Sequence, residues 1–182
     1  MIHNKKTRKV IAIVGKIGAG KDEAATYLSK KLGWPVFKMS DPLKNELKRQ
    51  KKEINRKNLA DLGTKWSREK GDDYLARLAL QSHKGNLIIS GPRQLGQIKY
   101  LHKKSDLTIV AISADDKIRF ERVISRKSVK EASSLQDFIK EELKNDASDG
   151  ANQVIKCIDQ AHCTIDNSST LKEMYNKLDK IL

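Results

Sequence analysis

A glycine-rich loop near the start of the chain is the feature that most clearly points to chemistry. Residues 15–22 read Gly-Lys-Ile-Gly-Ala-Gly-Lys-Asp, a GxxxxGK loop followed by aspartate. Glycines let the backbone approach a phosphate closely, backbone N–H groups donate to its oxygens, and the lysine reaches the terminal phosphates. The pattern therefore predicts a loop that binds a nucleoside triphosphate. Its expected contacts are Gly15, Lys16, Gly18, Ala19, Gly20, Lys21 and Asp22.

Asp22 departs from the common form of this loop, in which serine or threonine follows the lysine and gives its hydroxyl to Mg²⁺. A carboxylate can bind the ion directly or through a water, so Asp22 is a candidate Mg²⁺ ligand. Aspartate is also a favoured helix N-cap, and capping alone is an alternative of equal weight. The loop by itself leaves both roles open.

Three arginines further along the chain have helical spacing. Arg119, Arg122 and Arg126 are three and four residues apart, so their guanidinium groups share one face of the helix predicted over residues 115–126. Phosphoryl transfer needs mainly positioning and positive charge around the moving group, which arginines on a closing lid can supply. The alternatives are a solvated basic surface and, for Arg119, an ion pair with Asp115.

Other candidates follow predicted strands, where ligands bind in parallel sheets. Asp41 can orient an acceptor hydroxyl or take its proton, or it can cap the helix that follows. Arg93 offers a guanidinium fork suited to an acceptor phosphate. Asn167 can recognise an adenine edge or serve as a turn residue. The four histidines have no paired spacing, so none is assigned a metal or catalytic role.

Short apolar runs alternate with amphipathic stretches, and this alternation indicates the elements that position the candidates. Strands are expected over residues 10–14, 34–39, 86–90, 107–113 and 163–165. Helices are expected over residues 22–32, 41–50, 56–81 with breaks near Gly63 and Gly71, 95–101, 115–126, 133–143 and 169–182. Ser40 or Asp41 is the expected cap of the second helix, with Pro42 at its first position. The sequence predicts an α/β fold, an open parallel sheet of about five strands with helices on both faces.

Length, cysteine content and hydropathy restrict the class of protein. The chain has 182 residues, which suits one domain over residues 1–182. No apolar run reaches the roughly 18–20 residues of a membrane span, and the N-terminus has no apolar signal-peptide segment. Cys157 and Cys163 lack CxxC or metal-ligand spacing, which indicates a reducing compartment. We therefore expect a cytoplasmic protein without a membrane partner.

The net charge of +14, from 37 Lys and Arg against 23 Asp and Glu, predicts an anionic partner. Seven basic and two acidic side chains lie between Lys44 and Lys57. Part of the excess charge is therefore expected beside the bound acceptor, where it attracts anionic substrates.

Several segments carry a resemblance to known kinases. The loop is similar to the Gly-Lys-Asp version found in deoxynucleoside monophosphate kinases and other small-molecule P-loop kinases. The other matching segments resemble dephospho-CoA kinase-like proteins, especially an archaeal group of them. These segments are Met39–Lys44, Leu59–Thr64, Arg68–Asp72, Ser90–Arg93, Ala114 with Arg119–Arg122 and Arg126, and Ile165–Leu171.

This resemblance implies a three-layer P-loop kinase fold that uses ATP and Mg²⁺. It places an acceptor-binding segment at about residues 41–83 and a helical lid at about 115–145. It also implies catalytic roles for Lys21, Asp41, Arg93, Arg122 and Arg126, and nucleotide contacts for Arg119 and Asn167. The relatives have an aspartate at the position of Ser90 that holds the magnesium water shell. Ser90 offers only a hydroxyl, so either Asp22 or Asp41 compensates or turnover is slow.

Two functional hypotheses follow. The first is an ATP-dependent kinase for a small phosphorylated acceptor, dephospho-CoA or a (deoxy)nucleoside monophosphate. The second is a nucleic-acid-associated NTPase or nucleotide-binding regulator, suggested by the net charge and by Ser90. The kinase is favoured because the loop lies between a buried strand and an amphipathic helix, a specific context, whereas excess charge is not specific.

Overall fold

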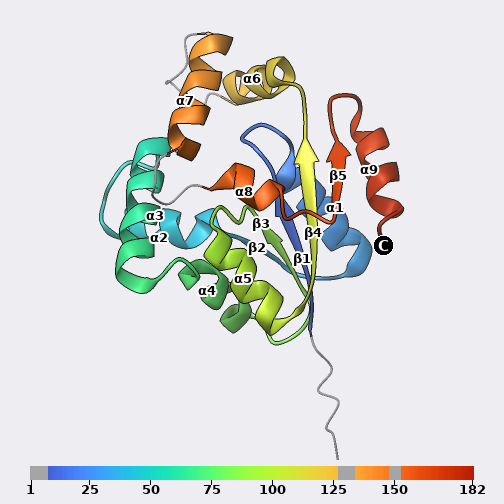
Figure 1. Ribbon diagram of the computed structural model, residues 1–182, viewed down its shortest axis with the longest axis horizontal. Coiled ribbons are helices and arrows are strands. Elements are labelled where there is room, and N and C mark those ends of the chain that lie inside the picture. The colour runs from blue at the N-terminus through green and yellow to red at the C-terminus, as the bar shows by residue number, and fades with distance from the viewer. Residues whose placement is uncertain (1–7, 127–133, 148–152) are drawn as a thin grey trace, which may run out of the picture.

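A parallel β-sheet forms the centre of the molecule, shown in Figure 1 as a computed structural model that describes residues 8–126, 134–147 and 153–182. The strand order is β2-β3-β1-β4-β5, and every neighbouring pair is parallel. The strands are β1 (Lys9–Val14), β2 (Val36–Lys38), β3 (Leu87–Ser90), β4 (Asp106–Ser113) and β5 (Cys163–Asp166). The predicted fold class is confirmed, and the carboxyl ends of these strands meet at one edge.

Helices connect and cover the strands. Within the described residues they are α1 (Lys21–Leu32), α2 (Ser40–Arg49), α3 (Arg56–Lys70), α4 (Tyr74–Ser82), α5 (Leu95–Lys104), α6 (Asp116–Ser125), α7 (Leu135–Ala147), α8 (Val154–Ile158) and α9 (Leu171–Asp179). The predicted helix over residues 56–81 is two helices that separate at Gly71, while α3 runs unbroken through Gly63. Helix α8 was not predicted from the sequence, because its five residues are too few to show a helical period.

The capping prediction for α2 is wrong. The helix begins at Ser40, and the residue before it, Met39, already has helical angles with a φ of −58°. No side-chain cap is formed there, and Asp41 lies inside the first turn instead of in front of it. The short passage from β2 directly into α2 leaves no extended residue that could act as the cap.

Two apolar clusters cover the two faces of the sheet. Val10, Ala12 and Val14 of β1 face one cluster, which includes side chains from α4, α5 and α8. Ile11 and Ile13 face the other, which includes side chains from α1 and α9. This alternation buries β1 on both faces, as its continuous apolar sequence predicts.

Two groups of helices lie beside these layers. Helices α2 and α3 share a smaller apolar cluster that contains Leu43, Leu47 and Leu62. Helices α6 and α7 lie beyond the carboxyl end of β4, at the top of Figure 1, and the rings of Phe120 and Phe138 are 5.7 Å apart between them. The predicted lid includes residues 127–133, which lie outside the described residues. Among the described helices, none is long and apolar enough to cross a membrane.

Candidate functional site

The glycine-rich loop joins β1 to α1 at the carboxyl edge of the sheet. Gly18 has a φ of 76° and Gly20 a φ of 103°, which residues with a Cβ rarely adopt. A Cβ on Gly18 would lie 2.5 Å from the backbone oxygen of Arg119 in α6. Glycine therefore serves both the turn and the close approach of α6.

Side chains from distant segments hold the carbonyl groups of this loop. Three successive backbone carbonyls accept hydrogen bonds from side chains. Arg119 Nη1 donates to the Ile17 carbonyl at 2.9 Å, and Arg122 Nη1 donates to the Gly18 carbonyl at 3.4 Å. Asn167 Nδ2 donates to the Ala19 carbonyl at 2.8 Å. The N–H of a trans peptide unit points opposite to its carbonyl. The N–H groups of these units therefore point away from the three side chains. That of Ala19 donates to the Lys16 carbonyl at 3.3 Å, and those of Gly18 and Gly20, without a partner among the described residues, are left to an anion.

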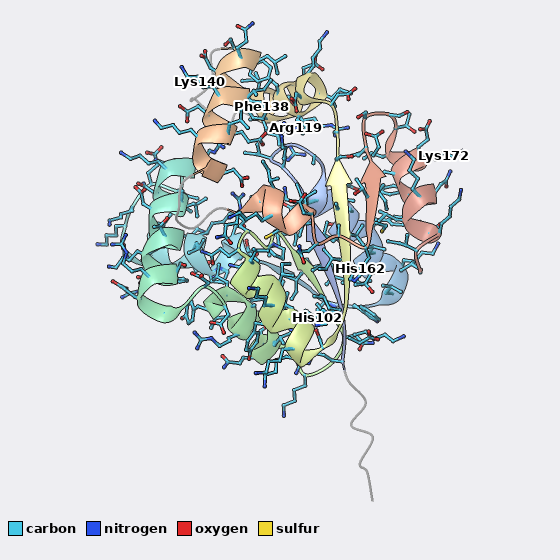
Figure 2. All side chains as sticks on the ribbon, in the orientation of Figure 1. His102, Arg119, Phe138, Lys140, His162 and Lys172 are labelled. Carbon is cyan, nitrogen blue, oxygen red and sulfur yellow. The ribbon has the colours of Figure 1, made fainter. Side chains whose placement is uncertain are left out.

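Arg119 is a buried side chain, only 1% exposed. Its guanidinium donates to both carboxylate oxygens of Glu142 in α7 at 2.8 Å, and to Asp116 at 2.5 Å. Figure 2 shows it beside Phe138, whose ring centroid is 5.3 Å from Arg119 Cζ. A solvated Arg119 is wrong because the side chain is buried, and a pair with Asp115 is wrong because the guanidinium bonds to Glu142 and Asp116 instead. Arg119 ties α6 and α7 to the loop.

Asn167 follows β5 and is 2% exposed. A Cβ on Gly20 would lie 2.3 Å from its Nδ2, so the amide packs directly against the loop. Its Oδ1 is buried and has no hydrogen-bond partner in the part of the chain that the structure describes. Asn167 is thus placed where it supports the loop, and its contact with a nucleotide remains a prediction.

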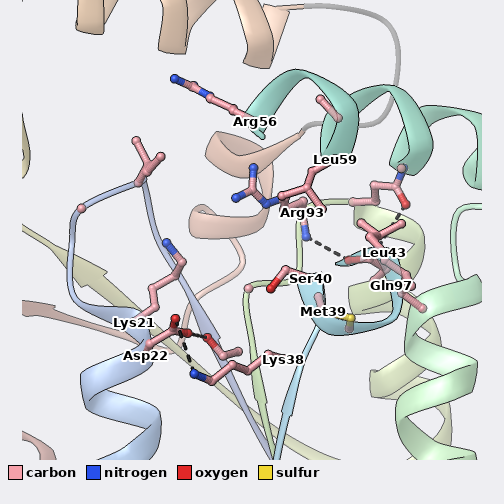
Figure 3. Close-up of a pocket in the computed structure, with 18 of the residues that line it drawn as sticks. Lys21, Asp22, Lys38, Met39, Ser40, Leu43, Arg56, Leu59, Arg93 and Gln97 are labelled. Carbon is pink, nitrogen blue, oxygen red and sulfur yellow. Dashed lines mark hydrogen bonds and ion pairs between the residues drawn. The ribbon is translucent and has the colours of Figure 1, made fainter. Parts of the chain in front are cut away.

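A cavity of about 260 Å³ lies beside the loop. Figure 3 shows Lys21 and Asp22 at one end of it and Arg56 and Arg93 at the other. Polar side chains that also line it are Glu23, Lys38, Ser40, Ser90, Gln94, Gln97 and Arg126. Its apolar wall is formed by Met39, Leu43, Leu59 and Leu75. Most of this wall comes from residues 41–83, the segment expected to bind an acceptor.

Arg93 and Arg56 bring two positive charges to the same end of the cavity. Arg93 follows β3, as the sequence predicts, and Arg56 is the first residue of α3. Neither guanidinium has a hydrogen bond or ion pair within the described residues. The surrounding protein keeps water away from the Arg93 guanidinium, and this desolvation lowers its pKa. Repulsion from Arg56 lowers the pKa further. Unpaired guanidinium groups at a cavity suit an anionic ligand.

The structure does not bring Asp41 to this cavity. Its carboxylate is exposed and lies 3.3 Å from Lys44 Nζ, one turn along α2. The preceding residue, Ser40, lines the cavity instead. The early start of α2 explains the difference, because it turns Asp41 toward solvent.

Asp22 lies in the first turn of α1, next to the ends of two strands. Ser90 Oγ donates to Asp22 Oδ1 at 2.9 Å, and Lys38 Nζ is 3.7 Å from Oδ2. No group of three or more His, Cys, Asp or Glu side chains that could hold a metal occurs among the described residues. A cation at Asp22 would therefore take its other ligands from phosphate or water, as Mg²⁺ does beside nucleotides.

Lys21 is the first residue of α1, and its Nζ donates to the Lys16 carbonyl at 2.7 Å. Burial lowers its pKa to about 7, and repulsion from Arg93 adds to the effect, while Asp22 and Glu142 oppose it. Glu142 also lies 3.5 Å from Lys16 Nζ. A phosphate bound in the loop would favour the charged form of Lys21.

Sequence reasoning missed two residues of this region. Glu142 carries no local signal, because its partner Arg119 is 23 residues away in the chain. Arg56 stands in the basic run between Lys44 and Lys57, but nothing in the run distinguishes it from its neighbours. Only its position at the start of α3 brings it to the cavity.

The parallel sheet, the loop between β1 and α1 and the cavity at the strand ends define the three-layer α/β fold of P-loop kinases. A family model described as AAA domain matches residues 14–140. The UPF0200 protein of Sulfurisphaera tokodaii is 30% identical over 179 residues, which cover 96% of each chain. The UPF0200 protein of Staphylothermus marinus is 27% identical over 176 residues, 95% of this chain and 90% of the relative. The chain belongs to this AAA domain family and is a member of the UPF0200 proteins.

Solved structures agree on the fold. Shikimate kinase from Acinetobacter baumannii in complex with shikimate has a TM-score of 0.62, covers 97% of this chain and 92% of its own, and is 16% identical. At this identity the likeness shows the fold alone. The specific resemblance to dephospho-CoA kinases remains a prediction.

Proposed function

We propose that this protein is an ATP-dependent phosphotransferase for a small acceptor that carries an anionic group. Dephospho-CoA and the (deoxy)nucleoside monophosphates are the acceptors that the sequence favours. The observation that carries the proposal is the chemical division of one cavity. Lys21 and Asp22 stand at one end, and the guanidinium groups of Arg56 and Arg93, which have no partner among the described residues, stand at the other.

The two ends assign the two substrates. The loop end would hold the phosphates of ATP, with the N–H groups of the loop and Lys21 as donors. Arg56 and Arg93 would hold the anionic group of the acceptor. The apolar wall, with Leu43 and Leu59, would pack against the body of the acceptor and exclude water.

The reaction is a direct transfer. An acceptor hydroxyl oxygen forms a bond to the terminal phosphorus of ATP while the bond from that phosphorus to the bridging oxygen breaks and ADP leaves. The hydroxyl proton passes to solvent or to a carboxylate. Mg²⁺, when bound with the nucleotide, would neutralise phosphate charge. Lys21 would stabilise the terminal phosphates, and Arg126, which lines the cavity, would meet the moving group.

Acceptor-dependent ADP formation tests the proposal. Purified protein would be given ATP, Mg²⁺ and one acceptor at a time from a panel of dephospho-CoA, the common monophosphates and shikimate. We expect slow ADP release without acceptor and fast release with one acceptor. Lys21→Ala should abolish nucleotide binding or turnover, while Lys30→Ala on the exposed side of α1 should leave both unchanged. A panel without acceptor-dependent ADP would reject the proposal.

A nucleic-acid-associated NTPase is the second candidate, and a basic surface favours it. Exposed basic side chains gather outside the cavity around the connection from α2 to α3, namely Lys48, Arg49, Lys51, Lys52 and Lys57. Contacts of this kind with nucleic-acid phosphates give affinity that falls steeply with salt. Absence of RNA and DNA binding at low salt would remove this candidate.

A further inference from the structure

Asp22 and Ser90 supply a carboxylate and a hydroxyl at the base of the loop, in exchanged positions. P-loop proteins in general hold nucleotide-bound Mg²⁺ with the hydroxyl that follows the loop lysine and with an aspartate from elsewhere in the fold. Here the aspartate follows Lys21, and the hydroxyl stands at the end of β3. Their side chains meet at 2.9 Å. The pair therefore keeps both donor types within one small volume.

Ser90 is held in a fixed place. It is 4% exposed and pairs in register with Ile13 of β1 and Lys38 of β2. Its carbonyl accepts from Met39 N at 3.0 Å. Because both its backbone and its burial restrict it, the Ser90 hydroxyl can fix the direction of the carboxylate to which it donates.

Asp22 is the more accessible member of the pair, with its side chain 63% exposed. The Ser90 hydroxyl occupies one carboxylate oxygen, and the other faces Lys38 Nζ at 3.7 Å. The positively charged ammonium group of Lys38 therefore already lies beside this carboxylate oxygen. Both Asp22 and Lys38 line the cavity next to the loop, where the phosphates of a nucleotide would lie.

We infer that Asp22 is the carboxylate that ties nucleotide-bound Mg²⁺ to this protein, and that Ser90 is a positioning residue that orients it. The inference rests on the proposed function only in requiring a nucleotide in the loop. It does not depend on the acceptor or on turnover. It also explains how the chain keeps a carboxylate near the metal although position 90 is serine.

The test is the effect of Mg²⁺ on ADP binding, measured by titration calorimetry in excess Mg²⁺ and in excess EDTA. The ratio of the two dissociation constants is the metal increment. We expect Asp22→Ser to reduce this increment by about tenfold or more, since losing a group that orients or holds a metal costs about 10–100-fold. Its affinity in EDTA should not fall, because the substitution removes a negative charge beside the phosphates.

The exchanged pair offers a rescue. The double variant Asp22→Ser with Ser90→Asp restores the common arrangement, with the hydroxyl after the lysine and the carboxylate on β3. We expect it to recover most of the metal increment that Asp22→Ser loses. Ser90→Ala should reduce the increment less than Asp22→Ser does, and should add nothing to it in combination, because both act on one carboxylate.

A spectroscopic readout and a control complete the experiment. The EPR spectrum of Mn²⁺ with ADP should broaden on binding to the natural protein and to the double variant, but less with Asp22→Ser. Asp106→Ser, an exposed carboxylate at the opposite edge of the sheet, should behave as the natural protein.

Three results would overturn the inference. They are a natural protein without a metal increment, an Asp22→Ser protein that keeps the full increment, and a folded double variant that recovers none of it. Each of these is compatible with ADP binding that depends on Lys21. Failure of the metal site is therefore distinguishable from failure of the proposed function, which is the absence of acceptor-dependent ADP formation with every acceptor of the panel.

Discussion

The guanidinium of Arg119 and the carboxylate of Glu142 form a two-pronged ion pair, with both N–O distances at 2.8 Å. Removal of one partner from a buried pair leaves the other charge uncompensated, at a cost of about 3–5 kcal/mol. Asp116 still contacts Arg119, so we expect Glu142→Ala to lower the free energy of unfolding by about 2–3 kcal/mol. Urea denaturation followed by circular dichroism measures the change.

Glu121→Ala is the matched control, since Glu121 is an exposed carboxylate of α6. A surface change of this kind should stay within about 0.5 kcal/mol of the natural protein. Equal stabilities for the two variants would show that the buried pair contributes nothing specific.

Asn167 should affect nucleotide binding through the loop. Asn167→Ala removes the hydrogen bond to the Ala19 carbonyl, which is worth about 1 kcal/mol. We expect the affinity for ATP to fall several-fold, measured by titration calorimetry. Asn167→Asp should lose more, because a carboxylate cannot donate to that carbonyl and adds negative charge near the phosphates. Asn176→Ala on the exposed side of α9 should leave the affinity unchanged, and an Asn167→Ala protein of full affinity would contradict the supporting role.

Local sequence patterns predicted the strands and helices whose formation depends on residues that are adjacent in the chain. Buried parallel strands read as continuous apolar runs, so Val10–Val14 marks β1, and Gly33 ends α1 with the left-handed φ of 69° expected of a terminal glycine. The loop is recognisable for the same reason, because its function depends on residues adjacent in the chain.

Contacts between distant segments could not be predicted in this way. The pairing of Arg119 with Glu142 depends on how α6 crosses α7, and the approach of Arg56 to Arg93 depends on where α3 packs. For Asp41, the sequence predicted a position at the cavity that the structure does not show. Asp41 follows a strand, which suggested a place at the cavity, but it lies in the first turn of α2 and its carboxylate contacts Lys44 one turn further along the helix.

Gly18 should not tolerate a larger side chain. In Gly18→Ala the new Cβ would meet the backbone oxygen of Arg119, and the left-handed φ of 76° adds strain. We expect a lower melting temperature and weaker ATP binding, because either the loop or α6 must move. Gly85→Ala is the control, since nothing lies within 4 Å of its added Cβ. Comparable behaviour of both variants in thermal denaturation and ATP titration would refute the close approach.

Lys21 should make nucleotide binding depend on pH. Its pKa of about 7 means that the free protein loses this proton above neutrality, whereas a bound phosphate favours the charged form. Binding should therefore take up a proton, and affinity should fall as pH rises from about 7 to about 9. Calorimetry in buffers of different ionisation enthalpy measures the uptake. Lys21→Arg should remove this dependence, and an unchanged pH profile in that variant would exclude Lys21 as its source.

The same lowered pKa has a consequence for stability. Between about pH 7 and 10.5 the unfolded chain holds the Lys21 proton more firmly than the folded protein does. The free energy of unfolding should therefore gain a contribution that rises with pH through this window. Lys21→Met, which has no titrating group, should lose that contribution in urea denaturation at several pH values. Parallel pH profiles for the two proteins would contradict it.

Arg56 should act on the acceptor and not on the nucleotide. It lines the cavity together with Arg93 and the apolar side chains of the acceptor-side segment, so Arg56→Met should raise the KM for an anionic acceptor about 10–100-fold. The affinity for ADP should stay the same, since the loop is unaltered. Lys57→Met is the matched control, because it removes a neighbouring charge that does not line the cavity. If both variants raised the KM equally and the effect vanished at high salt, Arg56 would contribute only to the general positive field around the cavity. A rise in KM that is confined to Arg56→Met and persists at high salt would indicate a direct contact with the acceptor.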